Sequence, residues 1–185
     1  MQTIIVYGKK EDSAISDTLQ KILDFYGKYY IFNSGTAIHS KFQDNVEQEF
    51  LIIDTDVMPI TQIGMKDIMI FKNEIPDLLN ITLPKMFCAV VESTNTNAIS
   101  LLNNSKIEVV TCGLSNKDTL TFSSAIEDRI VISLQRSLKN VFEKIIEPNE
   151  IPMNLPDDID RYAILSAVVT LILSGINFEN QVIKV

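Results

Sequence analysis

The first 27 residues of the chain predict a β-strand, a tight turn and an amphipathic helix in direct succession. Residues 3–7 form a short apolar run, and Gly8 follows them at the position of a turn. From residue 12 onward, apolar side chains recur every three or four positions, and Gly27 ends that helical pattern. In many α/β proteins a strand, turn and helix in this order hold a nucleotide phosphate at the helix N-terminus. The stretch therefore predicts an α/β architecture.

Continuous apolar runs further along predict more strands of the same sheet. Such runs occupy residues 50–53, 68–71, 86–91 and 107–111. A short run without polar alternation is typical of a parallel strand that is buried on both faces. A helix is predicted at 94–102, between the last two strands. Alternating strands and helices indicate a three-layer α/β fold with an open, mainly parallel sheet.

The order of the predicted elements changes in the second half of the chain. Residues 119–123, 129–134 and 141–146 look like three strands without intervening helices, which predicts an antiparallel extension of the sheet. A final helix is predicted at 158–174. Near the start of the chain, residues 29–32 predict a short strand, and the polar residues 33–48 predict a loop. We expect residues 1–185 to form a single domain.

The composition excludes several classes of function. The net charge is -8, with 24 acidic and 16 basic residues, and it is spread along the chain. This charge disfavours nucleic acid and anionic membranes as partners.

The longest apolar stretch, residues 163–176, is too short to cross a bilayer. Cys88 and Cys112 lie in apolar runs and are expected to be buried, reduced thiols. With no secretory signal at the start, we expect a cytoplasmic protein.

The order of elements and several short motifs resemble the central, ATP-binding domain of the Mur ligases. Residues 73–79 read Asn-Glu-Ile-Pro-Asp-Leu-Leu and are similar to the family's Asn-Ile-Ser-Pro-Asp-His-Leu. Residues 90–95 stand where the family has a strand followed by Asn-Ala-Asp-Asp, and residues 111–114 are similar to its strand-ending glycine. Leu155 and Pro156 precede the last helix as Leu-Pro-Gly does in the family. The resemblance covers nearly the whole chain and implies the fold of enzymes that form amide bonds in cell-wall precursors.

The chain departs from the family at the positions that carry chemistry. Where the family has a Thr-Gly-Thr-Asn-Gly-Lys-Thr-Thr turn, this chain has Lys-Lys-Glu-Asp-Ser after Gly8. The carboxylates of Glu11 and Asp12 would repel a triphosphate. Leu78 replaces the family's histidine, and residues 157–164 lack the polar groups that contact nucleotide. We also expect the family's flanking domains to be absent. The resemblance thus implies a non-catalytic relative.

Candidate binding residues follow the predicted strands, because ligands of such sheets lie beyond the carboxyl ends of the strands. Three carboxylates there, Asp54, Asp56 and Glu92, are candidate ligands of Mg²⁺. Asp54 stands where the family has a magnesium-binding glutamate. The alternative is that these loop tips are only charged and solvated. The candidate ligand-binding residues of the turn and its neighbourhood are Gly8, Lys9, Lys10, Glu11, Asp12, Ser13, Asn73 and Asp77.

Two main hypotheses of function remain, and a third possibility is an enzyme subunit completed by separate domains on another chain. The first is a protein-interaction or regulatory module that has lost ATP turnover, has no catalytic residue and no cofactor, and binds a protein partner or a second copy. The second is a metal-dependent small-molecule or nucleotide-binding protein, or an enzyme, that uses the acidic strand ends. His39 has no neighbour in sequence to orient it as a catalytic base. The aromatic residues near position 30 predict core packing or, alternatively, self-association; they are Tyr26, Tyr29, Tyr30 and Phe32.

Overall fold

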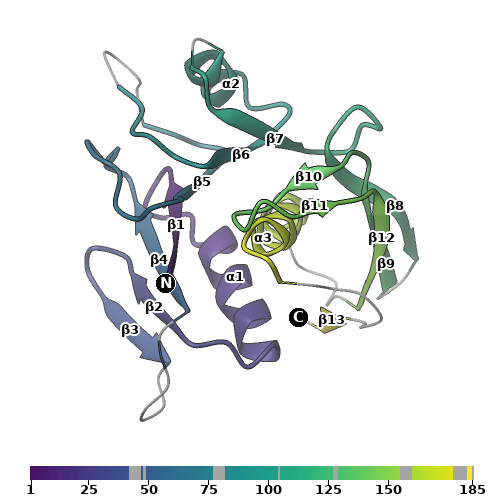
Figure 1. The fold of residues 1–185 in the computed structure, drawn as a ribbon, viewed down its shortest axis with the longest axis horizontal. Helices are drawn as coiled ribbons and strands as arrows, with labels where there is room; N and C mark the ends of the chain where they lie inside the picture. Colours follow the sequence, from purple (N-terminus) through teal and green to yellow (C-terminus); the bar gives the residue numbers. More distant parts are fainter. Residues whose placement is uncertain are drawn as a thin grey trace.

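In the part of the chain that the computed structural model describes, eleven strands form one sheet, in the order β13-β12-β9-β8-β7-β6-β5-β1-β4-β2-β3 (Figure 1). The structure describes residues 1–41, 47, 49–76, 82–103, 105–126, 129–154, 160–176 and 183–184. At the centre, β1 lies between β4 and β5, so that Ile4 pairs with Ile52 on one side and Ile68 on the other. Each pair of adjacent strands in the run β8-β7-β6-β5-β1-β4-β2 is parallel. The central strands are β1 (Gln2–Tyr7), β4 (Phe50–Thr55), β5 (Ile68–Phe71), β6 (Cys88–Glu92) and β7 (Glu108–Cys112).

The predicted parallel sheet is confirmed, since every central strand falls on one of the apolar runs. Ile68, Met69, Ile70 and Phe71 of β5 are all fully buried, as expected for a strand covered on both faces. Cys88 and Cys112 are buried free thiols, as predicted. Burial raises the pKa of both thiols. These side chains serve packing.

Three helices among the described residues complete the layers. Helices α1 (Ala14–Phe25) and α3 (Arg161–Leu173) lie on the concave side of the sheet, which curls around them (Figure 1). Every residue of α3 after Arg161 is buried. The short helix α2 (Thr96–Leu102) packs on the opposite face, where Ala98 and Leu102 join Tyr7 and Phe71 in a second, smaller core. All three helices begin and end close to the predicted positions. Within the described ranges, no helix is long and apolar enough to cross a bilayer.

The antiparallel extension exists, but its third strand is not the predicted one. Strands β8 (Leu120–Ile126) and β9 (Arg129–Leu134) match two predictions, and β9 pairs next with β12 (Asn149–Asn154). The predicted strand at 141–146 is wrong, because the Asn140 side chain accepts hydrogen bonds from the backbone of Phe142 and Lys144 and folds the run into a turn. That turn joins the two-residue strands β10 (Leu138–Lys139) and β11 (Ile145–Ile146). A short β13 (Ile183–Lys184) pairs with β12.

The region predicted as a loop after residue 32 contains an edge strand. Strand β2 (Tyr30–Asn33) pairs with β3 (Ile38–Lys41) as an antiparallel hairpin. The polar, mostly exposed side chains of β3 give no apolar pattern, which is why the sequence did not reveal it. Tyr30 and Phe32 are buried in the main core, which confirms the packing interpretation of these two aromatics.

Candidate functional site

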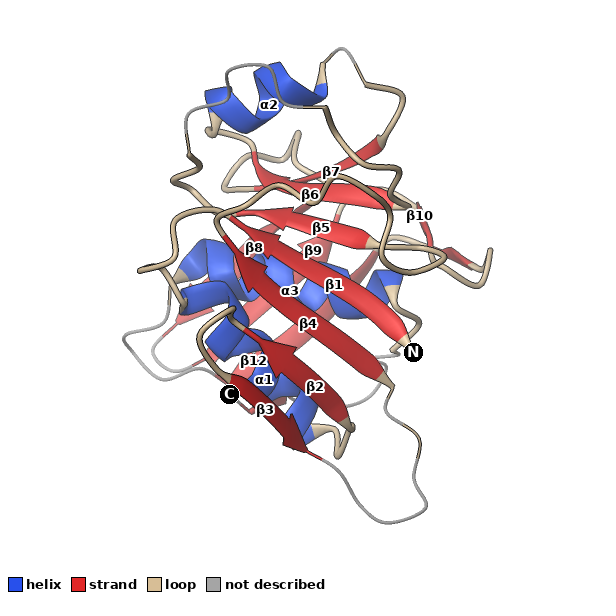
Figure 2. Ribbon diagram, turned by 90° about the vertical axis from the view of Figure 1, so that its left-hand side faces the viewer, coloured by secondary structure: helices blue, strands red, loops and turns tan. Residues whose placement is uncertain are grey.

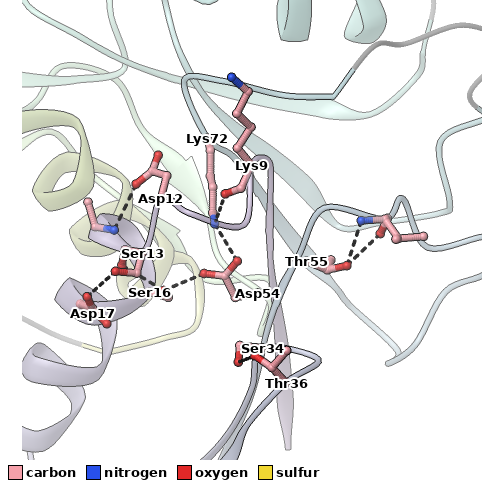
Figure 3. Close-up of polar contacts among 12 residues, drawn as sticks. Lys9, Asp12, Ser13, Ser16, Asp17, Ser34, Thr36, Asp54, Thr55 and Lys72 are labelled. Atoms are coloured by element: carbon pink, nitrogen blue, oxygen red, sulfur yellow. Dashed lines mark hydrogen bonds and ion pairs between the residues drawn. The ribbon is translucent and has the colours of Figure 1, made fainter.

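The turn that follows β1 is filled by the side chain of Lys72. Lys72 comes directly after β5 and has no solvent exposure. Its ammonium donates hydrogen bonds to the Asp54 carboxylate at 2.6 Å and to the backbone carbonyl of Lys9 at 2.9 Å (Figure 3). A cation therefore lies beneath the turn, but it belongs to the protein itself.

Asp54 connects this cation to the first helix. One carboxylate oxygen accepts from Lys72, and the other accepts from the Ser16 hydroxyl at 2.7 Å (Figure 3). All three side chains are buried. We call Lys72, Asp54 and Ser16 the turn cluster. It joins the ends of β5 and β4 to the first turn of α1, and its charges neutralise each other without a ligand.

Gly8 allows Lys72 to approach the turn so closely. A Cβ at this position would lie 2.4 Å from the Cβ of Lys72 and 2.7 Å from the Glu74 carbonyl oxygen. The backbone φ of 157° is also one that other residues rarely adopt. Gly8 is thus required for the contact with Lys72, and the residue that begins the turn serves packing.

Backbone N–H groups of the turn donate to protein carbonyls. Gly8 N–H donates to Thr55 at 3.1 Å, Lys9 N–H to Glu74 at 2.8 Å, and Asp12 N–H to Lys9 at 3.3 Å. A phosphate-binding turn aims such groups at its ligand. These three donors are already used, so they do not form a cradle for an anion.

The remaining side chains of the turn are engaged at the surface or at the helix start. The Asp12 carboxylate accepts from the backbone of Ala14 at 3.1 Å, and Ser13 donates to Asp17 at 2.7 Å. Carboxylates are favourable at this positive end of a helix. Lys9 forms an exposed ion pair with Glu74, which raises the pKa of Lys9 and lowers that of Glu74. Lys10 and Glu11 are exposed.

The structure does not gather the three candidate metal ligands. Asp54 is paired with Lys72, Asp56 is exposed beyond the end of β4, and Glu92 is half-buried at the end of β6. Among the described residues, no three His, Cys, Asp or Glu side chains are grouped in a way that could hold a metal ion. Magnesium binding stays a prediction, and its central residue, Asp54, already has a cationic partner.

Two of the candidate binding residues, Asn73 and Glu92, line the same pocket. The pocket has a volume of about 270 Å³ and lies beside Asp160 and Arg161, at the start of α3. Asp77 lies outside the described residues. His39 is on the edge strand β3, where its ring stacks on Phe32 with centroids 6.2 Å apart.

Lys72, Ser16 and Asn95 were not among the candidate site residues predicted from the sequence, although Lys72 was expected at the same sheet edge as Asp54. Asn95 donates to the Lys72 carbonyl at 2.9 Å and caps α2 by accepting from Ala98 at 3.0 Å. The sequence contains one indication of this cluster, because Lys72 directly follows one apolar run and Asp54 directly follows another. Their proximity follows from the sheet order, in which β4 and β5 flank β1.

The chain is an α/β protein in which β1, the following turn and α1 are arranged as in a nucleotide-binding site. The space beneath the turn is filled by the side chain of Lys72. Among solved structures, the Mur ligases share this fold. The structure of UDP-N-acetylmuramoyl-L-alanyl-D-glutamate--2,6-diaminopimelate ligase matches with a TM-score of 0.58 and 11% identity, over 97% of this chain and 44% of that one. The structure of UDP-N-acetylmuramate:L-alanyl-gamma-D-glutamyl-meso-diaminopimelate ligase (MPL) from Neisseria meningitides matches with a TM-score of 0.59 and 12% identity, over 96% of this chain and 62% of that one.

A MurF ligase from Thermotoga maritima, solved in complex with ADP, matches with a TM-score of 0.52 and 8% identity, over 96% of this chain and 46% of that one. The resemblance stated from the sequence is thereby confirmed for the fold: this chain has a Mur ligase-like fold. It spans between 44% and 62% of the length of these three structures. No family model and no curated protein matches the chain.

Proposed function

We propose that this chain is a non-catalytic module with a Mur ligase-like fold, which does not turn over ATP and acts through protein interaction or regulation. The observation that carries the proposal is the buried ion pair between Lys72 and Asp54 under the turn. The pair occupies the place where a nucleotide-binding protein of this outline would present a free cation and free N–H groups to phosphate.

Electrostatics support the same conclusion. The charge of Lys72 is offset by Asp54, the turn around it carries the carboxylates of Glu11 and Asp12, and the first turn of α1 carries that of Asp17. Bringing a triphosphate here would place like charges together, and opening the ion pair would leave a carboxylate buried without a partner. The charge repulsion and the cost of opening the ion pair both oppose nucleotide binding.

Calorimetric titration with Mg-ATP and Mg-ADP tests the proposal. ADP is included because one solved neighbour is in complex with it. We expect no binding heat at nucleotide concentrations up to about 1 mM, with a Mur ligase as positive control. Micromolar binding by the wild-type chain would overturn the proposal.

A further inference from the structure

A pocket of about 790 Å³ lies at the amino ends of β6 and β7, beside the end of α2. One wall is formed by residues 82–87, which lead into β6, and the other by residues 105–108, which lead into β7. Figure 2 shows α2 at the top of the molecule, above these two strands. Because β1, β5, β6 and β7 are parallel, this edge of the sheet is opposite to the edge that carries the Gly8 turn. The pocket is therefore separate from the candidate site.

The apolar lining of the pocket is an extension of the smaller core. Leu83, Met86, Leu101 and Ile107 line the pocket and also pack, partly buried, against that core. Helix α2 has only seven residues, and the core remains open to the pocket at its end. Pockets for small molecules have volumes of roughly 300–1,000 Å³ and mainly apolar linings with a few polar groups. This pocket has both properties.

Two lysines give the pocket a positive charge. Lys85 and Lys106 stand one on each wall, and both are exposed. Neither forms an ion pair with another described residue. Glu108 is the single carboxylate among the described lining residues, so two lysines against one glutamate leave one net positive charge, although the whole chain carries -8. Lysine stems lie along apolar surface while their ammonium groups stay in water. The pocket thus combines an apolar wall with cations at its mouth.

Both walls are held in place by hydrogen bonds. The Phe87 N–H donates to the Asp67 carbonyl at 2.7 Å and fixes the end of the first wall. In the second wall, the Ser105 hydroxyl donates to the Leu102 carbonyl at 2.8 Å and accepts from the Ile107 N–H at 3.3 Å. A preformed pocket has a smaller ordering cost on binding than one that must be assembled.

We propose that this pocket binds a small anion with a long apolar body, of the class of fatty carboxylates. The apolar body lies on Leu101 and Ile107, and the carboxylate meets Lys85 and Lys106. A cationic amphiphile would instead meet two like charges. The inference goes beyond the proposed function, because it adds a ligand site at the other edge of the sheet.

The charge distribution favours a small anion over an acidic macromolecule. Charges in water are screened beyond roughly 8 Å at physiological salt, so a small anion in the pocket interacts mainly with the two lysines. A large acidic partner would extend over surface that carries the net charge of -8 and would be repelled by it.

Calorimetric titration of the full chain with dodecanoate, at concentrations up to about 1 mM, tests the inference. We expect a dissociation constant below about 100 µM. Dodecyltrimethylammonium, with the same chain and a cationic head, should bind at least tenfold more weakly. Lys85→Glu combined with Lys106→Glu should weaken dodecanoate binding at least tenfold. The matched control is Lys21→Glu combined with Lys117→Glu, because both lysines are exposed outside the pocket and the change in net charge is the same. It should change the constant less than about twofold.

Three results would each overturn the inference. The first is no binding of dodecanoate by wild type. The second is equal binding of dodecanoate and dodecyltrimethylammonium, which would reflect apolar contact alone. The third is a pair of double variants with the same affinity, which would place the ligand outside this pocket. Circular dichroism establishes that both double variants are folded.

Discussion

The ammonium of Lys72 lies 2.6 Å from the carboxylate of Asp54, and the two side chains are 0% and 6% exposed. Lys72 directly follows β5, and Asp54 is the last residue but one of β4. These two strands flank β1, and the two side chains meet beneath Gly8. Removing two ions from water has a large desolvation cost, which only their mutual attraction and further hydrogen bonds offset. Each charge is therefore tolerable only while the other is present.

Loss of the lysine charge should strongly destabilise the fold. Lys72→Met leaves Asp54 as an unpaired buried carboxylate, and we expect the free energy of unfolding to fall by about 3–5 kcal/mol. Urea denaturation measures the change. Lys9→Met is the matched control, because its ion pair with Glu74 is exposed and should contribute little.

The coupling between the two charges can be measured separately. Adding Asp54→Asn to Lys72→Met removes the stranded carboxylate and retains an acceptor for Ser16. We expect the double variant to recover more than about 1 kcal/mol relative to the sum of the single changes. Additivity within about 0.5 kcal/mol would contradict a direct ion pair.

Gly8→Ala should destabilise the protein through the contact with Lys72. The new Cβ would lie 2.4 Å from the Cβ of Lys72, at a φ that is unfavourable for alanine. We expect a loss of about 2 kcal/mol or more from overpacking and backbone strain. Gly27→Ala separates these causes, because Gly27 has a φ of 63° and a Cβ added there would meet no heavy atom within 4 Å. That control should cost about 1 kcal/mol, and equal losses at both sites would argue against the packing role of Gly8.

Stability should decline in alkaline solution. Burial raises the pKa of the Cys112 thiol above its ordinary value of 9.0, with smaller contributions from Asp118, Cys88 and Glu92, and also raises the pKa of Cys88. The folded chain then retains protons that the unfolded chain has released. This contribution is full below about pH 9 and decreases as the pH rises above it.

Urea midpoints between neutral and alkaline pH measure this decline. In a Cys112→Ala variant the midpoint should fall less steeply above about pH 9, although its value at neutral pH is lower because a cavity remains. A wild-type midpoint that stays constant into the alkaline range would contradict the burial of the thiols.

Removal of two helix caps should reduce the stability of the protein by different amounts. Asp160 caps α3 through the backbone of Ala163 at 2.7 Å, and Asp160→Ala should cost about 1 kcal/mol. Asn95→Ala removes the cap of α2 and also the hydrogen bond to the Lys72 carbonyl, so we expect about 2 kcal/mol. Thermal unfolding of the two variants makes the comparison. A greater loss at Asp160 would show that the link to Lys72 contributes nothing.

The sequence predicts what is encoded locally. Strand β5 was predictable because a strand buried on both faces must be apolar at each position. Strand β3 was not, because its exposed residues lack a pattern, and β12 carries Pro152 within a mixed segment. In the site, Gly8 and the acidic turn were visible, whereas the pairing of Lys72 with Asp54 depends on the spatial order of strands, and chain order does not contain it.

The burial of α3 has a consequence for biosynthesis. This helix is the centre of the main core, yet it comes from residues 161–173, and ten of the eleven strands of the described sheet are synthesised before it. Until then the apolar surface that it covers has no partner, and the contacts it makes with β6 and α1 span much of the chain. Such distant contacts form slowly and leave nascent chains prone to aggregation. We therefore expect the fold to be completed only after α3 has been synthesised, and to benefit from a chaperone that shields the open concave face.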